Sequence, residues 1–427
     1  MEMLRTVTKA WNIPDVRKKI LFTLAMLLIF RIGAQIPVPG IDREVLAQTF
    51  DSDTGLFALF NLFSGGAFSN FTIFALSITP YITASIIMQL LAIAIPSLER
   101  LSKEGMEGRK KMASYTRYLT VALAVIQAVG VSVGLFRQAL ISTDVFSVTV
   151  IVLVLTAGTA FLMWLGEQIN EYGIGNGISL IIFAGIIARL PSAVQEIWNK
   201  LQEGTMSVVT LILFVIFCIL VIVGIIEIQQ GQRRIPVQYA KRVVGRKQYG
   251  GQATHIPLRV NQAGVIPVIF AMAFLQFPLT ITYFMSADSD ASAFIAKWLS
   301  PSGSPGIWVY SLINVVLIMF FTYFYTSVTF KPDEVATNMK SSGGFIPGIR
   351  PGKATEEYLS RVMTRITFVG AVFLAAVAIL PTIVSEMGGL NFHFGGTSLL
   401  IAVGVALDTM KKLEQQMVMR NYSGFLK

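Results

Sequence analysis

Five stretches of this chain run for 21 to 25 residues without a single charged side chain, at 71–95, 145–165, 206–226, 264–285 and 307–330. A helix of about 20 apolar residues is long enough to cross the hydrocarbon core of a bilayer. Only 14% of the 427 residues are charged and 54% are hydrophobic, whereas soluble domains carry about 25% charged residues. The chain therefore lacks the charged coat of a soluble protein, and the pattern predicts an integral membrane protein.

Five further apolar stretches fit the same length rule, although each is shorter or less uniform. They lie at 20–36, 113–135, 173–190, 366–384 and 392–407. The first contains Arg31, and those at 173–190 and 392–407 are short and glycine-rich. Together, the ten stretches predict an all-α membrane protein with ten transmembrane helices.

The distribution of basic residues tests this count, because cytoplasmic loops of membrane proteins carry an excess of Lys and Arg. Of the 34 basic residues, 27 fall on one set of alternate connecting segments, 4 fall on the other set, and 3 lie within or at the ends of the apolar stretches. A miscounted helix would scramble this alternation. We therefore expect both termini to be cytoplasmic, with segments 1–19 and 411–427 in the cytosol.

Ten spans divide into two halves of five, 20–190 and 206–410, joined by an external hinge loop at 191–205. Because five is odd, the second half of a tandem repeat would be inverted relative to the first. The second and seventh spans then correspond, and they contain Pro80 and Pro267, which we expect to interrupt the helices. Matched broken helices point to a transport pathway between the repeats. Prolines are also ordinary in membrane helices, so position alone leaves both interpretations open.

The stretch at 55–70 is apolar but too short to cross a membrane, and Gly65 and Gly66 divide it. It precedes the second span on the external side. A segment of this kind is either a helix in the membrane interface or a re-entrant piece that fills a cavity.

The cytosolic loop at 229–262 has a residue pattern that a simple connector would not need. Two runs of alternating apolar residues flank a glycine-rich turn, which predicts a β-hairpin. This hairpin would project a cluster of basic residues, either as plain topogenic charge or as a docking surface for an acidic partner or RNA. The loop at 331–363 is also long and is punctuated by proline and glycine.

The residues give little support for a disulfide, a metal site, ion-coupled transport or nucleotide binding. A lone Cys218 excludes an internal disulfide, and His255 and His393 are too few for a histidine-rich metal site. The spans hold almost no acidic residues or histidines, which weakens the case for an ion-coupled transporter. The segment around Gly352 and Lys353 lacks the spacing of a phosphate-binding loop. We expect no cofactor and no enzymatic activity.

Six segments, read together, resemble the bacterial form of the SecY family of protein-translocation channels. They are ALSITPYITASIIMQLL at 75–91, GIGNGISLIIFAGI at 173–186, GQRRIPVQYAKR at 231–242, NQAGVIPVIF at 261–270, GGFIPGIRPGKAT at 343–355 and FGGTSLLI at 394–401. They occur in the family's order, and the resemblance extends over nearly the whole chain. The resemblance implies two inverted five-helix halves that open like a clamshell, with a re-entrant plug at 55–70 and a lateral gate between the second and seventh spans.

The resemblance also assigns residues by motif position. The pore ring comprises Ile78, Ile82, Ile178, Ile182, Ile269 and Ile401. The plug contains Leu56, Phe57, Leu59, Phe60, Leu62, Phe63, Gly65 and Gly66. The lateral gate includes Pro80, Gln89, Asn176, Asn261 and Pro267. The residues that dock the motor or the ribosome are Arg233, Arg234, Lys241, Arg242, Arg246, Lys247 and Arg350.

The implied partners are the small membrane subunits SecE and SecG, the motor ATPase SecA, the ribosome, precursor polypeptides with signal sequences, and the phospholipids of a bacterial plasma membrane. The implied function is to conduct unfolded polypeptides across the membrane and to release hydrophobic segments sideways into it. Two alternatives remain from the residues alone: an inverted-repeat transporter of a small solute, and a membrane scaffold without conductance.

Overall fold

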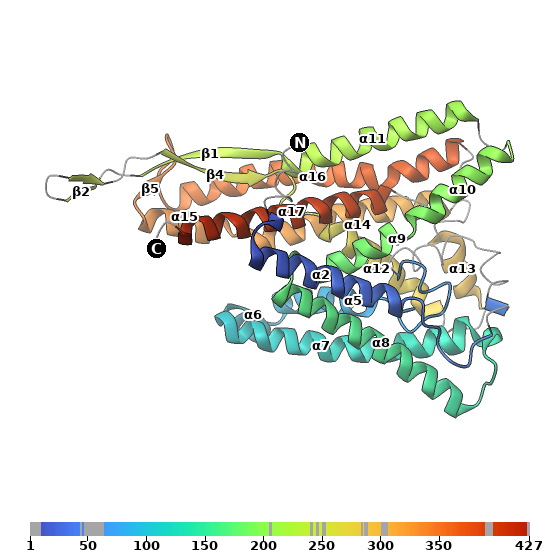
Figure 1. Cartoon of the computed structure of the whole chain (residues 1–427). Coiled ribbons are helices and arrows are strands. Elements are labelled where there is room, and N and C mark those ends of the chain that lie inside the picture. The colour runs from blue at the N-terminus through green and yellow to red at the C-terminus, as the bar shows by residue number, and fades with distance from the viewer. Residues whose placement is uncertain are drawn as a thin grey trace.

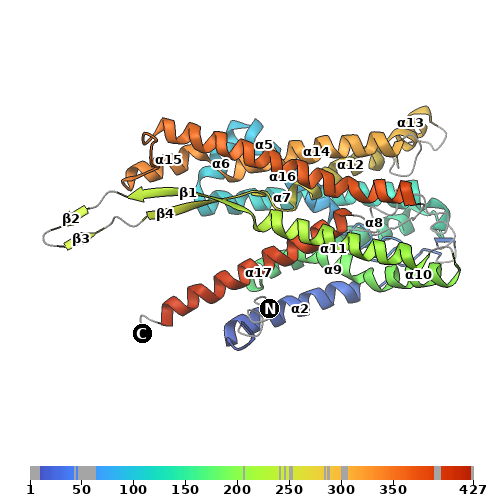
Figure 2. The same cartoon turned by 90° about the horizontal axis from the view of Figure 1, so that it is seen from above.

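The computed structural model describes residues 10–42, 45–46, 64–204, 207–239, 242–244, 247–249, 253–282, 285, 289–299, 306–388 and 396–424. Over these residues the chain forms a bundle of long helices that run side by side, and a β-sheet arm projects from one end of the bundle (Figure 1). We call this end the arm end. Helix α2 begins and helix α17 ends on this side (Figure 2).

Each of the ten predicted spans overlaps one helix. These helices are α2 (Pro14–Gly33), α5 (Thr79–Ala94), α7 (Gly105–Val129), α8 (Val145–Tyr172), α9 (Gly177–Ala188), α11 (Val208–Gln230), α12 (Ile266–Thr282), α14 (Gly306–Thr329), α16 (Lys353–Gly388) and α17 (Gly396–Gly424). A single π-helical turn, η1 (Gly130–Leu135), extends α7 to the end of its predicted span.

By length and composition, six helices of the described residues can cross a membrane, or seven if the bent pair α5 and α6 (Pro96–Lys103) is one span. The axes of that pair differ by 103°. Helix α12 has 17 residues, while α2 and α17 carry several charged residues. The helical membrane fold is therefore confirmed, and the count of ten crossings stays a prediction.

The second and seventh spans differ from the expected interrupted helices. Residues 71–78 form turns rather than helix, and α5 begins only at Thr79. Pro80 is thus in the first turn of α5, and Pro267 is the second residue of α12. Proline is tolerated at these positions because the first N–H groups of a helix have no intrahelical acceptor. The prediction that both prolines break a helix is wrong, since both help to start one.

Three further short helices lie in the connections: α10 (Leu190–Gln202), α13 (Asp290–Trp298) and α15 (Pro332–Ser341), together with one 3₁₀ turn, η2 (Arg137–Ala139). Helix α10 occupies most of the segment 191–205, for which we expected a loop. Its apolar residues recur at helical spacing, at Leu190, Val194, Trp198 and Leu201. This period of three and four favours a helix over a loop.

The helices pack in sequence order within each half of the chain. In the first half, α5 contacts α7, α7 contacts α8, and α8 contacts α9 and α2. The second half repeats this arrangement, with contacts from α12 to α14, α14 to α16, α16 to α17 and α17 to α11. The contacts between the halves include α5 with α12 and α9 with α17. An ion pair from Arg117 Nε to Glu167 Oε1, at 2.7 Å, joins α7 to α8.

The arm confirms the predicted β-hairpin. Strand β1 (Gln232–Tyr239) pairs antiparallel with β4 (Ala253–Arg259), in a register that runs from Gln232 opposite Arg259 to Gln238 opposite Ala253. Beyond them, β2 (Arg242–Val244) pairs with β3 (Lys247–Tyr249). A third strand, β5 (Gly344–Phe345), pairs with the end of β1.

One face of β1 is buried and the other is exposed, as alternation along a strand requires. Ile235 and Val237 are buried against Met339 of α15 and Leu359 of α16. The described residues of the loops at 229–262 and 331–363 therefore pack together as one folded body, which we call the arm.

Candidate functional site

The six isoleucines assigned to the pore ring all belong to one large apolar cluster that joins the two halves. Five of them are buried in this cluster and Ile178 packs against it as a partly buried neighbour. They come from the start of α5, from α9, from α12 and from α17. Four helices thus contribute these isoleucine side chains to one large apolar cluster, although their positions span more than 300 residues of sequence.

Local structure fixes the two isoleucines of α9. Asn176 caps this helix, because its side-chain Oδ1 accepts a hydrogen bond from the N–H of Ile178 at 3.2 Å. A Cβ at Gly177 would collide with the carbonyl oxygen of Gly166 on α8, so only glycine allows this close approach of the backbones. Ile178 and Ile182 are four residues apart and therefore share one face of α9.

The residues assigned to the lateral gate separate into two groups. Pro80 and Gln89 lie on α5 and Pro267 lies on α12, and these two helices pack against each other. The Gln89 amide donates to Ser85 Oγ in its own helix at 3.2 Å. Asn176 and Asn261 instead line a cavity near the arm end.

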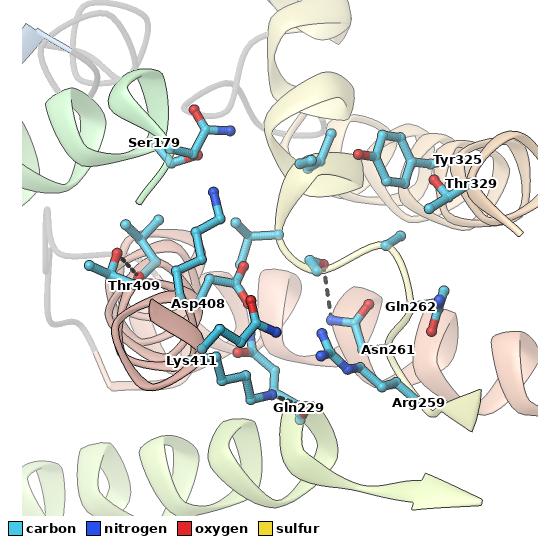
Figure 3. Close-up of a pocket in the computed structure, with 18 residues that line it drawn as sticks. Ser179, Gln229, Arg259, Asn261, Gln262, Tyr325, Thr329, Asp408, Thr409 and Lys411 are labelled. Atoms are coloured by element: carbon cyan, nitrogen blue, oxygen red, sulfur yellow. Dashed lines mark hydrogen bonds between the residues drawn. The ribbon is translucent and has the colours of Figure 1, made fainter. Parts of the chain in front are cut away.

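This cavity has a volume of about 340 Å³ and lies between the halves (Figure 3). Asn176 and Ser179 of α9 line it from the first half. The second half contributes Gln229, Arg259, Asn261, Gln262, Tyr325, Thr329, Asp408, Thr409, Lys411 and Lys412, among others. The Asn261 amide donates to the carbonyl oxygen of Gly264 at 2.9 Å, which fixes the turn that leads into α12.

The charged residues that line the cavity carry a positive excess. Arg259, Lys411 and Lys412 outnumber the single acid, Asp408. Although the Asp408 carboxylate opens to the cavity, the surrounding protein removes enough water to raise its pKa, and the nearby Lys411 opposes that shift. Burial, reinforced by Arg259, lowers the pKa of Lys411. Both shifts favour the neutral form.

Several cavity residues were not found by sequence reasoning. Gln229, Asp408 and Lys411 sit at or beyond the ends of apolar stretches, where polar residues are ordinary. Their convergence depends on tertiary contacts between α11 and α17, such as the hydrogen bond from Lys411 Nζ to the Gln229 carbonyl oxygen at 3.3 Å. No signal in the sequence relates these positions.

Of the residues assigned to the plug, Leu56, Phe57, Leu59, Phe60, Leu62 and Phe63 lie outside the described residues. Gly65 and Gly66 are described and have left-handed φ angles of 62° and 90°. A Cβ at Gly65 would meet the backbone of Gly185 on α9 at 2.6 Å, and the Gly65 carbonyl accepts from Arg31 Nη1 at 3.3 Å. The segment from Ser64 onward is therefore packed inside the bundle rather than on its surface.

The residues assigned to docking that the structure describes lie on the arm. Arg233 and Arg234 are exposed on β1, Arg242 is in β2, and Lys247 is in β3. Lys241 and Arg246 lie outside the described residues. Arg350 is exposed in the turn between β5 and α16. Because β5 pairs with β1, one sheet joins the two loops that are predicted to dock partners.

The comparisons with known proteins decide the family. A model of the SecY family matches residues 72–410, which is most of the chain. This chain belongs to the SecY family. The protein translocase subunit SecY of Halalkalibacterium halodurans is 50% identical over the full length of both chains. The same subunit of Bacillus subtilis is 48% identical, also over the full length of both.

Solved SecY structures share the fold. A protein-conducting channel superposes with a TM-score of 0.66 at 23% identity, covering 94% of this chain and 93% of its own. A SecY channel whose plug domain stabilises the closed state gives the same TM-score at 24% identity, covering 94% of this chain and 92% of its own. The predicted family and the helical channel fold are confirmed, and the chain is a multi-pass membrane protein. The relatives do not favour the solute-transporter alternative.

Proposed function

We propose that this SecY-family chain is the central channel subunit of a protein translocase. It conducts unfolded polypeptides across the membrane and releases hydrophobic segments sideways through a gate between α5 and α12. The observation that carries the proposal is that the six isoleucines, from four helices of both halves, belong to one apolar cluster. In this proposal these six side chains form the closed ring of the pore within that cluster.

An isoleucine ring suits a pore that must accept every kind of side chain. Specific polar contacts would favour some sequences over others, whereas isoleucine side chains seal around a chain without hydrogen-bonding to it. An empty apolar constriction also excludes ions by dewetting. A channel with this ring therefore admits polypeptides without sequence preference and stays closed to ions at rest.

The hydrophobicity of a signal sequence is about sufficient to open such a gate. A signal sequence has roughly 7–15 apolar residues, and each contributes about −0.3 to −0.6 kcal/mol in the membrane. Ten of them therefore supply roughly 3–6 kcal/mol. Turning a two-state gate from mostly closed to mostly open takes about 5.5 kcal/mol.

The arm end is the cytoplasmic side in this proposal, and both termini are cytoplasmic. Support comes from the basic residues concentrated on that side of the chain. Arg233, Arg234 and Arg350 would receive the motor SecA or the ribosome, and SecE and SecG would complete the complex in a bacterial plasma membrane. A Sec61 channel in a ribosome–channel complex, 21% identical, has the same fold. The segment 55–70 would be the plug that blocks the pore beneath the ring.

The test of the proposed function is reconstitution. The chain, with SecE and SecG, is placed in vesicles together with SecA, ATP and a secretory precursor. Protection of the precursor from added protease then reports its entry into the vesicle lumen. Protection that depends on both ATP and the channel supports the proposal, and its absence with an active motor contradicts it.

The ring makes a first prediction. Ile401 is fully buried in the cluster, so Ile401→Asn places an amide where no water reaches in the closed state. We expect the closed state to weaken, ion leak to rise, and precursors with weak signal sequences to pass more readily. Planar-bilayer conductance and the translocation of weak-signal precursors measure both effects.

Ile401→Val is the matched control, because it keeps the site apolar and branched. Its leak and signal stringency should stay near those of the parent. Equal leak and equal stringency in the Asn and parent channels, at equal abundance, would remove Ile401 from the ring.

A further inference from the structure

Ser77 holds a backbone conformation that non-glycine residues seldom adopt. Its φ is +53°, in the left-handed region, where the Cβ of an L-residue crowds the backbone at a cost in free energy. The residue is 1% exposed and its N–H donates to the carbonyl oxygen of Phe74 at 2.8 Å. It immediately precedes the ring residue Ile78. The strain therefore sits at the entrance to gate helix α5.

The chain on either side of Ser77 shows why strain collects there. Before it, the segment is tied to the loop that follows α2: Val38 N–H donates to the Phe71 carbonyl, and Ile73 N–H donates to the Ile36 carbonyl, each at 3.0 Å. After it, α5 is a regular helix that packs against α12. A movement of α5 away from α12 must be taken up between these two parts, so Ser77 lies at the hinge.

The opposing gate helix holds a second unfavourable feature. Gln276 of α12 is 2% exposed, and within the described residues neither its Nε2 nor its Oε1 has a hydrogen-bond partner. Leaving a buried amide unpaired costs free energy because its hydration is lost without replacement. Gln276 follows the ring residue Ile269 by seven residues and thus lies on the same face of α12, about 10 Å further along the helix.

We infer that Ser77 and Gln276 keep the closed gate at a raised free energy, and that they thereby set how hydrophobic a signal sequence must be to open it. Separation of α5 from α12 lets the backbone at Ser77 relax and lets water or the passing chain reach the Gln276 amide. The free-energy cost at each residue is present in the closed state and absent from the open state. The inference rests on the proposed function, because it assigns these roles within the proposed gate.

The first test separates backbone strain from the Ser77 hydroxyl. Ser77→Gly removes the strain, since glycine adopts positive φ freely, whereas Ser77→Ala removes the hydroxyl and keeps the strained Cβ. We expect Ser77→Gly to translocate a weak-signal precursor about tenfold more slowly than the parent, the size of effect that relief of such strain produces. Ser77→Ala should stay near the parent. Ala75→Gly, two residues away at a position without positive φ, controls for glycine itself.

The second test replaces the amide. Gln276→Met keeps an unbranched side chain of similar length without polar atoms, so the closed state should gain stability. We expect translocation of the weak-signal precursor to fall several-fold, because the variant removes the free-energy cost that an unpaired buried amide adds to the closed state. Thr159→Val is the control. Thr159 of α8 is 1% exposed, and its Oγ1 has no hydrogen-bond partner in the described residues. Because α8 is not one of the two gate helices, loss of the Thr159 hydroxyl should not alter the gate.

All variants are assayed as the assembled complex in vesicles, with a strong-signal and a weak-signal precursor, and abundance is checked by blot. Open probability in planar bilayers gives a second readout, which should fall for Ser77→Gly and Gln276→Met. A Ser77→Gly channel that matches Ser77→Ala, or a Gln276→Met channel that matches the parent, overturns the role of that residue. If instead the parent channel translocates neither precursor, the proposed function itself fails, which is a distinct result.

Discussion

Joining α5 to α12 by a disulfide should reduce translocation to background, and a reducing agent should restore it. The two helices come from different halves and pack against each other, so a covalent bond between them prevents the proposed gate from opening. Cysteine pairs are introduced in a channel whose native Cys218 has been replaced. The positions combine Thr83, Ile86 or Ile87 on α5 with Phe270 or Ala273 on α12. Only pairs with Cα atoms about 4.4–6.8 Å apart can form the bond, so several combinations are tested.

A second cysteine pair controls for the effect of crosslinking itself. Helices α7 and α8 pack against each other within the first half, so cysteine pairs between them are chosen by the same range of Cα separation. Such a disulfide should leave translocation intact because it does not cross the gate. A channel that still translocates with α5 and α12 quantitatively crosslinked would contradict the proposed gate. If no pair between the two helices crosslinks, their contact is itself refuted.

Hydropathy located the helices well because the bilayer imposes one length on every span. It failed at residues 71–78, which are as apolar as the rest of their stretch but form turns. Apolar composition reports only that a segment is buried, and it does not specify φ at Phe71 or Ser77, both of which are positive. Those angles are set by contacts with residues far along the chain, such as the hydrogen bond between Val38 and Phe71.

The arm shows the same division between local and distant information. Alternation of apolar residues and a glycine-rich turn predicted the pairing of β1 with β4, since both strands are close in sequence. The pairing of β1 with β5 joins residues more than 100 positions apart and has no local signal. Likewise, motif positions named Asn176 and Asn261, but the cavity that both of them line comes from the packing of five helices and the end of β4.

Arg350→Glu should abolish SecA-driven translocation while leaving the channel folded and assembled. Arg350 is exposed at the end of a turn that the structure holds firmly. The Thr355 hydroxyl donates to the Arg350 carbonyl oxygen at 2.9 Å, and the flanking Gly348 and Gly352 have φ angles of 82° and 101°, which only glycine adopts easily. The backbone is thus fixed and the guanidinium projects outward, on the same body as Arg233 of β1.

A guanidinium held in this way can make paired hydrogen bonds to a carboxylate, and lysine cannot reproduce that geometry. We therefore expect Arg350→Lys to impair translocation and Arg350→Glu to eliminate it. Breaking one buried charged contact at an interface costs about 2–5 kcal/mol, which corresponds to a loss of roughly 30-fold to several-thousand-fold in affinity. If Arg350 only contributes positive charge to the cytoplasmic side, the neighbouring basic residues would cover its loss.

Lys353→Glu is the matched control for Arg350→Glu. It makes the same change of charge three residues away, at an exposed position that begins α16, where the helix N-terminus favours an acidic side chain. The assay is translocation of a strong-signal precursor into vesicles at saturating ATP, with binding of SecA to the same vesicles measured in parallel and channel abundance checked by blot. Loss of both activities in Arg350→Glu, with both retained in Lys353→Glu, assigns docking to the Arg350 side chain. Normal translocation by the Arg350→Glu channel at normal abundance would instead leave Arg350 as one more positive charge on the cytoplasmic side.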